Sequence, residues 1–172
     1  MVEALILVVF PFCMAYAAIS DMITMTIANR VSLLLVAVFI VAAPLAGMPM
    51  VTIGMHLLAG LLVLGVTFAL FAFGTMGGGD AKLLAATAVW MGLGMSLAEY
   101  VVIGSICGGV LTLLIIVYRN SPISDVTGNF VLLRKFSDRR VGIPYGIALG
   151  LAGLVVFPTS PMGVWAIEAL AR

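Results

Sequence analysis

Residues 51–73 read VTIGMHLLAGLLVLGVTFALFAF and contain no Lys, Arg, Asp or Glu. A helix needs about 20 apolar residues to cross a bilayer, so this stretch is long enough to span one. The rest of the chain is similar: 64% of its 172 residues are hydrophobic and 9% are charged, whereas a soluble domain has about a quarter charged residues. So few charges cannot cover a water-exposed surface, which excludes a soluble enzyme. The chain also has no basic patch for nucleic acid. The sequence therefore predicts an all-α integral membrane protein.

Charges, prolines and glycine clusters divide the chain into six apolar segments, which predict a bundle of about six transmembrane helices in one domain over residues 1–172. The predicted spans are residues 4–20, 31–46, 51–73, 81–94, 97–118 and 141–157. Residues 47–50 and 92–94 are rich in Gly and Pro and predict tight breaks between neighbouring helices. The second and fourth spans are short, so we expect their ends to extend into the flanking residues. The polar stretch 119–140 predicts a loop.

Basic residues indicate the orientation of the bundle. Seven of the eight Lys and Arg fall on one side of the membrane when the spans alternate, and they are Arg30, Lys82, Arg119, Arg134, Lys135, Arg139 and Arg140. Loops rich in Lys and Arg stay in the cytoplasm, so the 119–140 loop is predicted to be cytoplasmic and both termini to point outward. We expect its cluster of basic residues to contact anionic lipid headgroups. No Lys or Arg precedes the first apolar segment, which argues against a cleaved signal peptide.

Two acidic residues, Asp21 and Asp80, lie at the cytoplasmic ends of predicted spans and at about the same depth. An ionisable group at the edge of an apolar span is costly, so each is a functional candidate. Two carboxyl groups a few ångströms apart resist ionising together, and such a pair can hydrolyse an amide bond. The ionised member then activates water while the protonated member polarises the carbonyl.

Each of these acids also has a plain structural explanation. Asp80 follows Gly77-Gly78-Gly79, and an Asp after a glycine-rich turn is typical of a helix N-cap. The glycines would allow positive φ angles and a close approach of substrate backbone. Helix N-terminal amides favour a negative charge, so Asp80 is predicted to be the ionised partner. Asp21 could simply mark where the first helix leaves the membrane.

Other polar or reactive residues give weaker signals. Lys82 is two residues from Asp80, so the two side chains should not face each other on a helix, and we expect Lys82 to reach the cytoplasmic interface. His56 lies near the outer end of the third span and is predicted to be interfacial. Cys13 and Cys107 lie in apolar runs, where a free Cys behaves as a small hydrophobe. Neither metal nor cofactor is expected.

Small residues recur every fourth position in two spans. They are Gly142, Gly146 and Gly150 in the last span, and Gly104 and Gly108 in the fifth. Small residues at this spacing let membrane helices approach closely. The pattern predicts tight helix packing in this part of the bundle.

Three motifs resemble those of one enzyme family. The run Gly77-Gly78-Gly79-Asp80-Ala81-Lys82 resembles the G-x-G-D-x-K signature of the type IV prepilin peptidases, which are membrane aspartic proteases of the GxGD class. Asp21 followed by Ile27-Ala28-Asn29 resembles their first-aspartate motif, with Ala28 in place of the usual Pro. Pro144-Tyr145-Gly146 is similar to the proline–tyrosine–glycine motif near the family's last helix.

The resemblance implies roles for individual residues. Asp21 and Asp80 would be the catalytic pair that activates water for direct attack on a peptide bond. The supporting motif residues would be Gly77, Gly79, Lys82, Asn29, Pro144, Tyr145 and Gly146.

The resemblance also implies a substrate and a location. The substrate would be a prepilin or pseudopilin with a short basic leader ahead of an apolar helix, cut at the cytoplasmic face of the bacterial inner membrane. Pilus or secretion assembly machinery would be a further partner. The chain looks like the short branch that serves tight-adherence (Flp) pili. The long members carry an inserted domain with paired cysteines that methylates the product, and N-methyltransferase activity is not expected here.

Two other functions are compatible with the residues. A small multi-pass carrier could use the two carboxylates to relay protons or cations, although a transporter usually shows internal repeats or interrupted helices. Alternatively, the chain could be a non-catalytic subunit of a pilus-assembly machine, in which both aspartates would be dispensable.

Overall fold

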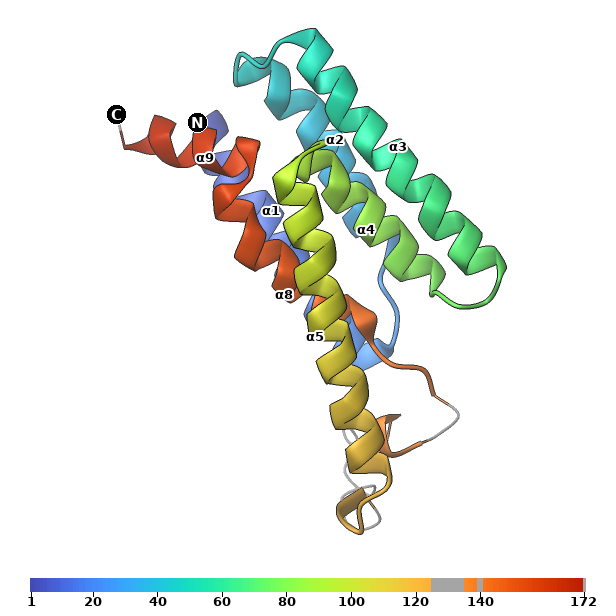
Figure 1. Ribbon diagram of the computed structural model, residues 1–172. Helices are drawn as coiled ribbons and strands as arrows, with labels where there is room; N and C mark the ends of the chain where they lie inside the picture. The colour runs from blue at the N-terminus through green and yellow to red at the C-terminus, as the bar shows by residue number, and fades with distance from the viewer. Residues whose placement is uncertain (125–134, 139–140, 172) are drawn as a thin grey trace.

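The computed structural model describes residues 1–124, 135–138 and 141–171, and over these residues the chain is helical and contains no strand (Figure 1). This confirms the predicted all-α class. The elements are α1 (Val2–Thr24), α2 (Asn29–Leu45), α3 (Met50–Ala72), α4 (Gly78–Met91), α5 (Met95–Arg119), α8 (Tyr145–Val156), the 3-10 turn η1 (Phe157–Thr159) and α9 (Pro161–Leu170). Most of the predicted 119–140 loop lies outside the described residues.

The predicted count of six membrane-crossing helices is not confirmed. Helices α1, α3 and α5 are long and apolar enough to cross a membrane, and α8 with α9 forms a pair, bent by 56°, that could make a fourth span. Helices α2 and α4 have 17 and 14 residues. At 1.5 Å per residue, α4 is about 21 Å long, which is shorter than the roughly 30 Å hydrocarbon core.

Helices α2 and α4 extend into the flanking residues at their starts, as expected, and begin at Asn29 and Gly78. The other end of α4 does not extend, because Gly92 stops it. Gly92 has a φ of 70°, a conformation that L side chains rarely adopt. A Cβ at this position would also lie 2.7 Å from Cε1 of His56. Both constraints require glycine here, so the break predicted at residues 92–94 is confirmed.

Helix α4 lies at the centre of the bundle. All its residues from 85 to 91 are buried, and it contacts α2, α3, α5, α8 and α9. Figure 1 shows α2 and α3 on one side of α4, with α1, α5 and α8 on the other. A segment that is apolar almost all round, as residues 83–91 are, is typical of such a buried position, which explains why this short helix has the composition of a membrane span.

His56 belongs to an aromatic cluster, so the prediction that it is interfacial was wrong. The imidazole is 4% exposed, stacks on Phe39 at 5.2 Å between ring centroids and bonds through Nδ1 to Val89 O at 2.8 Å. Trp90 in the same cluster donates from Nε1 to Leu35 O at 3.0 Å. Buried polar groups require such partners, and carbonyls on distant helices provide them.

Small residues bring α8 close to α1 and α5. An added Cβ would lie 2.7 Å from Met14 O at Gly150, and 2.8 Å from Asp21 Cβ at Gly146. Gly104 and Gly108 on α5 face Leu149 and Tyr145 of α8. The predicted close packing is confirmed at these positions. Gly142 is the exception because it precedes α8, which begins at Tyr145.

Helix α9 was not predicted from the sequence, although a signal for it was present. Ser160 is its N-cap and accepts a hydrogen bond from Gly163 N at 3.2 Å, and Pro161 occupies the first turn. Ser followed by Pro is a typical start for a helix.

Candidate active site

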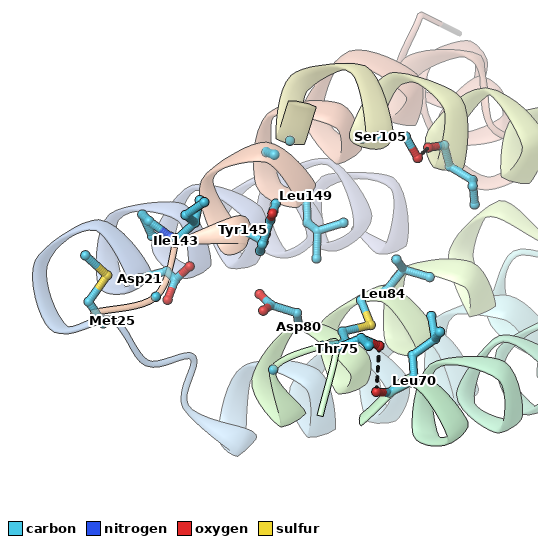
Figure 2. Close-up of a pocket in the computed structure, with 18 of the residues that line it drawn as sticks. Asp21, Met25, Leu70, Thr75, Asp80, Leu84, Ser105, Ile143, Tyr145 and Leu149 are labelled. Carbon is cyan, nitrogen blue, oxygen red and sulfur yellow. Dashed lines mark hydrogen bonds between the residues drawn. The ribbon is translucent and has the colours of Figure 1, made fainter. Parts of the chain in front are cut away.

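A cavity of about 670 Å³ lies at the end of the bundle where α1 and α3 end and α4 and α8 begin, beside residues 101–108 of α5. Asp21 and Asp80 both line it (Figure 2). Much of its wall is apolar or small, and these residues include Met25, Leu70, Leu84, Val101, Gly104, Gly108, Ala148 and Leu149. Figure 2 shows both carboxylates directed into the same space, and they are near enough for their charges to interact. The structure thus brings the two candidate acids together from helices far apart in sequence.

Asp21 is held by the start of α8. Helix α1 continues past Asp21 to Thr24, so Asp21 does not end the helix as the sequence suggested. Its side chain is buried, and its Oδ2 accepts a hydrogen bond from Gly146 N at 2.7 Å. Gly146 lies in the first turn of α8, where free amides and the helix dipole stabilise negative charge. The chain therefore provides a charge-stabilising donor for Asp21.

The chain reverses direction just after Asp21. Met25 has a left-handed φ of 57° and its N–H donates to Asp21 O at 2.9 Å. The Ser20 hydroxyl donates to Thr26 O at 3.0 Å, and the Thr24 hydroxyl donates to Ser20 O at 2.7 Å. These bonds fold residues 25–28 back over the cavity end of the bundle.

Asp80 is the third residue of α4 and is not its N-cap. The N-cap is Gly77, no side-chain bond caps this helix, and Gly77 has a φ of −69°. The interpretation of Asp80 as the N-cap is therefore wrong, and this glycine run does not use the positive φ angles that glycine allows. In this region the left-handed glycine is Gly74, with a φ of 72°. Within the described part of the chain, no donor bonds to the Asp80 carboxylate.

The motif glycines make room for side chains. A Cβ on Gly77 would lie 2.6 Å from Oδ2 of Asp80, so the carboxylate itself occupies that space. A Cβ on Gly79 would lie 3.2 Å from Cβ of Ile27. Both glycines leave room for groups that approach their Cα atoms closely, and neither has a positive φ.

Ile27 links the two acidic segments, a role that sequence reasoning missed. It packs against Gly79, next to Asp80, and its Cδ1 lies 2.8 Å from where a Cβ on Gly146 would be. It therefore fills the space between the start of α4 and the start of α8. Its position in the first-aspartate motif was the available signal, but its contacts lie far away along the chain.

Lys82 and Asn29 connect the two aspartate motifs. Lys82 Nζ donates to Asn29 Oδ1 at 2.9 Å, which ties the start of α4 to the start of α2. Ala28, the N-cap of α2, has a φ of −66°. Proline fixes φ near −65°, so Ala28 already has the backbone angle of the proline that is usual at this motif position.

The third motif forms one wall of the cavity. Pro144 is the N-cap of α8, and the Tyr145 ring lies over Gly108 of α5. The Tyr145 hydroxyl bonds to Thr112 Oγ1 at 3.1 Å. Thr112 carried no signal in the sequence, because its partner comes from a different helix.

The described basic residues gather at the same end as the cavity. Lys82 bonds to Asn29, Lys135 Nζ donates to Ile23 O near the end of α1, and Arg119 binds residues just before α8. Arg30 follows Asn29 at the start of α2. Among the described residues, no cluster of three His, Cys, Asp or Glu could hold a metal ion.

The fold and the cavity define a helical membrane protein with two acidic side chains facing each other at one end of its bundle. The sequence model of the type IV leader peptidase family matches residues 8–114, more than half of the chain, and this range includes both acids. The chain belongs to this family.

One curated relative extends the comparison. The prepilin leader peptidase/N-methyltransferase of Xanthomonas campestris pv. campestris is 38% identical over 82 residues. The alignment covers 48% of this chain and 23% of that protein, so the chain matches less than a quarter of its relative. No solved structure matches the chain.

Proposed function

We propose that this protein is a membrane aspartic endopeptidase that removes the short basic leader from type IV prepilin-like precursors. The observation that carries the proposal is the pair Asp21 and Asp80, which come from separate helices and line one cavity. Membership of the type IV leader peptidase family supports the reaction class. Short tight-adherence (Flp) prepilins are the proposed substrates, and the chain would act without N-methyltransferase activity.

The proposed mechanism assigns the two acids different roles. Because their charges interact, they resist ionising together and hold one proton between them. The amide of Gly146 supports the negative charge on Asp21, so Asp21 is the proposed base. This reverses the assignment suggested by the sequence, which placed the charge on Asp80.

The chemical steps follow from this assignment. Asp21 takes a proton from water as the water oxygen attacks the scissile carbonyl, and Asp80 gives its proton to the carbonyl oxygen. The tetrahedral intermediate then collapses. Asp21 passes its proton to the leaving nitrogen, and Asp80 takes back the hydroxyl proton as the carbonyl reforms. Both acids return to their starting states, and no cofactor is needed.

The shape of the cavity suits a substrate that continues as an apolar helix. From the acids, the cavity extends along α5 past Gly108 and Ser105 to Val101, which is about 10 Å of helix. Leu70, Leu84 and Leu149 complete this apolar wall. We propose that the helix after the scissile bond lies here, with the basic leader outside the bundle.

We place this end of the bundle at the cytoplasmic face of the bacterial inner membrane. The four described Lys and Arg residues support this orientation, because all of them lie near the cavity end and basic loops stay in the cytoplasm. They are Arg30, Lys82, Arg119 and Lys135.

The test is leader removal in cells. The full chain is co-expressed with a tight-adherence prepilin in a bacterial strain without its own prepilin peptidase, and cleavage is followed by electrophoretic shift and N-terminal sequencing. Asp21→Asn and Asp80→Asn should each abolish cleavage at wild-type membrane levels. Glu99→Gln is the matched control, because Glu99 is an exposed acid of α5 that does not line the cavity.

Different outcomes would favour the two rival functions. If the wild type leaves the leader intact but moves protons or cations in proteoliposomes, and either Asn variant stops that flux, the chain is a carrier. If the wild type does not cleave and both Asn variants still support pilus assembly, it is a non-catalytic subunit. An Asn variant that cleaves at the wild-type rate would overturn the proposed mechanism.

A further inference from the structure

Arg119, the last residue of α5, binds three backbone carbonyls. Its Nε donates to Phe136 O at 2.8 Å, and its Nη2 donates to Val141 O at 2.9 Å and to Gly142 O at 3.3 Å. The sequence suggested only a topology anchor that contacts lipid headgroups. The half-buried guanidinium instead faces the chain that leads into α8.

This chain, residues 141–144, is here called the return segment. It has no helical bonds of its own, and its Gly142, Ile143 and Pro144 line the cavity. Backbone carbonyls outside regular structure need partners, and Arg119 provides them for the first two residues. Tyr145 directly follows the return segment, and its hydroxyl forms a hydrogen bond with the Thr112 hydroxyl.

The return segment ends two residues before the amide that holds Asp21. Pro144 is the N-cap of α8, and Gly146 N donates to Asp21 Oδ2 at 2.7 Å. A chain of contacts thus runs from Arg119 through the return segment to the Asp21 carboxylate. If the return segment moves, the first turn of α8 and its amide move with it.

We propose that Arg119 is a positioning residue for Asp21: its guanidinium fixes the return segment so that the Gly146 amide meets the carboxylate. The inference rests on the proposed function, in which Asp21 is the base. The shape of the side chain matters as well as its charge. A guanidinium presents donors in a rigid planar fork, whereas a Lys ammonium is a point charge on a flexible stem.

Arg119→Lys separates positioning from topology. It keeps the positive charge that orients the membrane helices but cannot hold Phe136 and the return segment together. We expect kcat for leader removal to fall roughly 10- to 100-fold, as for a displacement near 1 Å, with KM within about twofold of wild type. Arg30→Lys is the control, because Arg30 lies at the same end of the bundle but does not line the cavity. It should keep wild-type kcat.

A second measurement does not depend on cleavage. Ile143→Cys is introduced after Cys13 and Cys107 are replaced by Ala, and its rate of maleimide labelling is measured in detergent. Adding Arg119→Lys should speed labelling several-fold, because the return segment is released, whereas Arg30→Lys should not change it. The orientation of each variant in the membrane is checked by reporter fusions at the C-terminus.

The outcomes separate this inference from the proposed function. Unchanged labelling and unchanged kcat in Arg119→Lys would overturn the positioning role. If Arg119→Lys labels faster but the wild type cleaves no prepilin, the role of Arg119 in holding the return segment is supported and the proposed function is refuted. An inverted orientation in Arg119→Lys would show that topology is the function of this residue, and would also overturn the inference.

Discussion

Replacing Gly146 by Ala tests whether the contact between α8 and Asp21 sets the activity. A Cβ at Gly146 would lie 2.8 Å from Asp21 Cβ, from Asp21 Oδ2 and from Ile27 Cδ1, whereas ordinary contacts begin at 3.4 Å. The start of α8 and the side chain of Asp21 must therefore separate by at least about 0.6 Å. The 2.7 Å bond between Gly146 N and Asp21 Oδ2 would lengthen to about 3.3 Å, beyond the usual range of about 2.7–3.2 Å.

Two effects of Gly146→Ala follow from this displacement. Overpacking typically lowers the free energy of unfolding by about 1–3 kcal/mol. A misplacement near 1 Å can lower a rate by about 10²-fold, so we expect kcat for leader removal to fall roughly 10- to 100-fold. The assay uses purified protein in detergent with a prepilin substrate, and rates are normalised to the folded fraction measured by thermal unfolding.

Gly153→Ala is the matched control on the same helix. Gly153 also packs against α1, but an added Cβ would meet the Sδ of Met14 at 2.7 Å, and an unbranched Met side chain can adjust. We expect its normalised kcat to stay within about twofold of wild type. The reasoning fails if Gly146→Ala keeps wild-type kcat, or if Gly153→Ala loses as much activity as Gly146→Ala.

Two further substitutions test the turn and the cavity. Ala28→Pro should keep activity and raise the free energy of unfolding by about 0.4–1 kcal/mol, because the native φ of −66° already suits proline. Thermal unfolding measures this gain in stability, and a loss of stability would contradict the prediction. Ser105→Trp should raise the KM for a full-length prepilin at least about tenfold by filling the cavity that Ser105 lines, because a steric clash rejects the bound helix. Gly109→Trp, on an open side of the same helix, should leave that KM unchanged in the same assay, and equal effects of both Trp variants would exclude the proposed docking site.

Signals that are local in sequence predicted much of the fold. Long apolar runs with at most one charged residue identified α1, α3 and α5 within a few residues of their observed bounds, because crossing a bilayer requires length and apolarity in one continuous segment. The same rule misread α4. Burial against five neighbouring helices demands the same apolar composition as contact with lipid, so composition alone could not distinguish a buried short helix from a membrane span.

The roles of His56 and Ile27 show what local patterns leave out. A single His near the end of an apolar run suggested the interface, yet Val89 O and Phe39 provide a buried site for it. The sequence placed Ile27 in the first-aspartate motif but gave it no contacts, yet it contacts both Gly79 and Gly146. These environments are made by residues from other helices, and a single sequence carries no record of such pairings.

The two acids themselves were found from the sequence because lipid excludes charge, and few acidic residues could lie at the basic end of the bundle. The sequence did not indicate which of the two acids is the base and which is the proton donor. The capping rule considers only the residues next to Asp80 and placed the negative charge on it. The donor that matters belongs to Gly146 and reaches Asp21, across 125 positions of the sequence. This contact exists only because α8 packs on α1 through glycines, so the assignment of base and acid follows from helix packing and not from either aspartate motif alone.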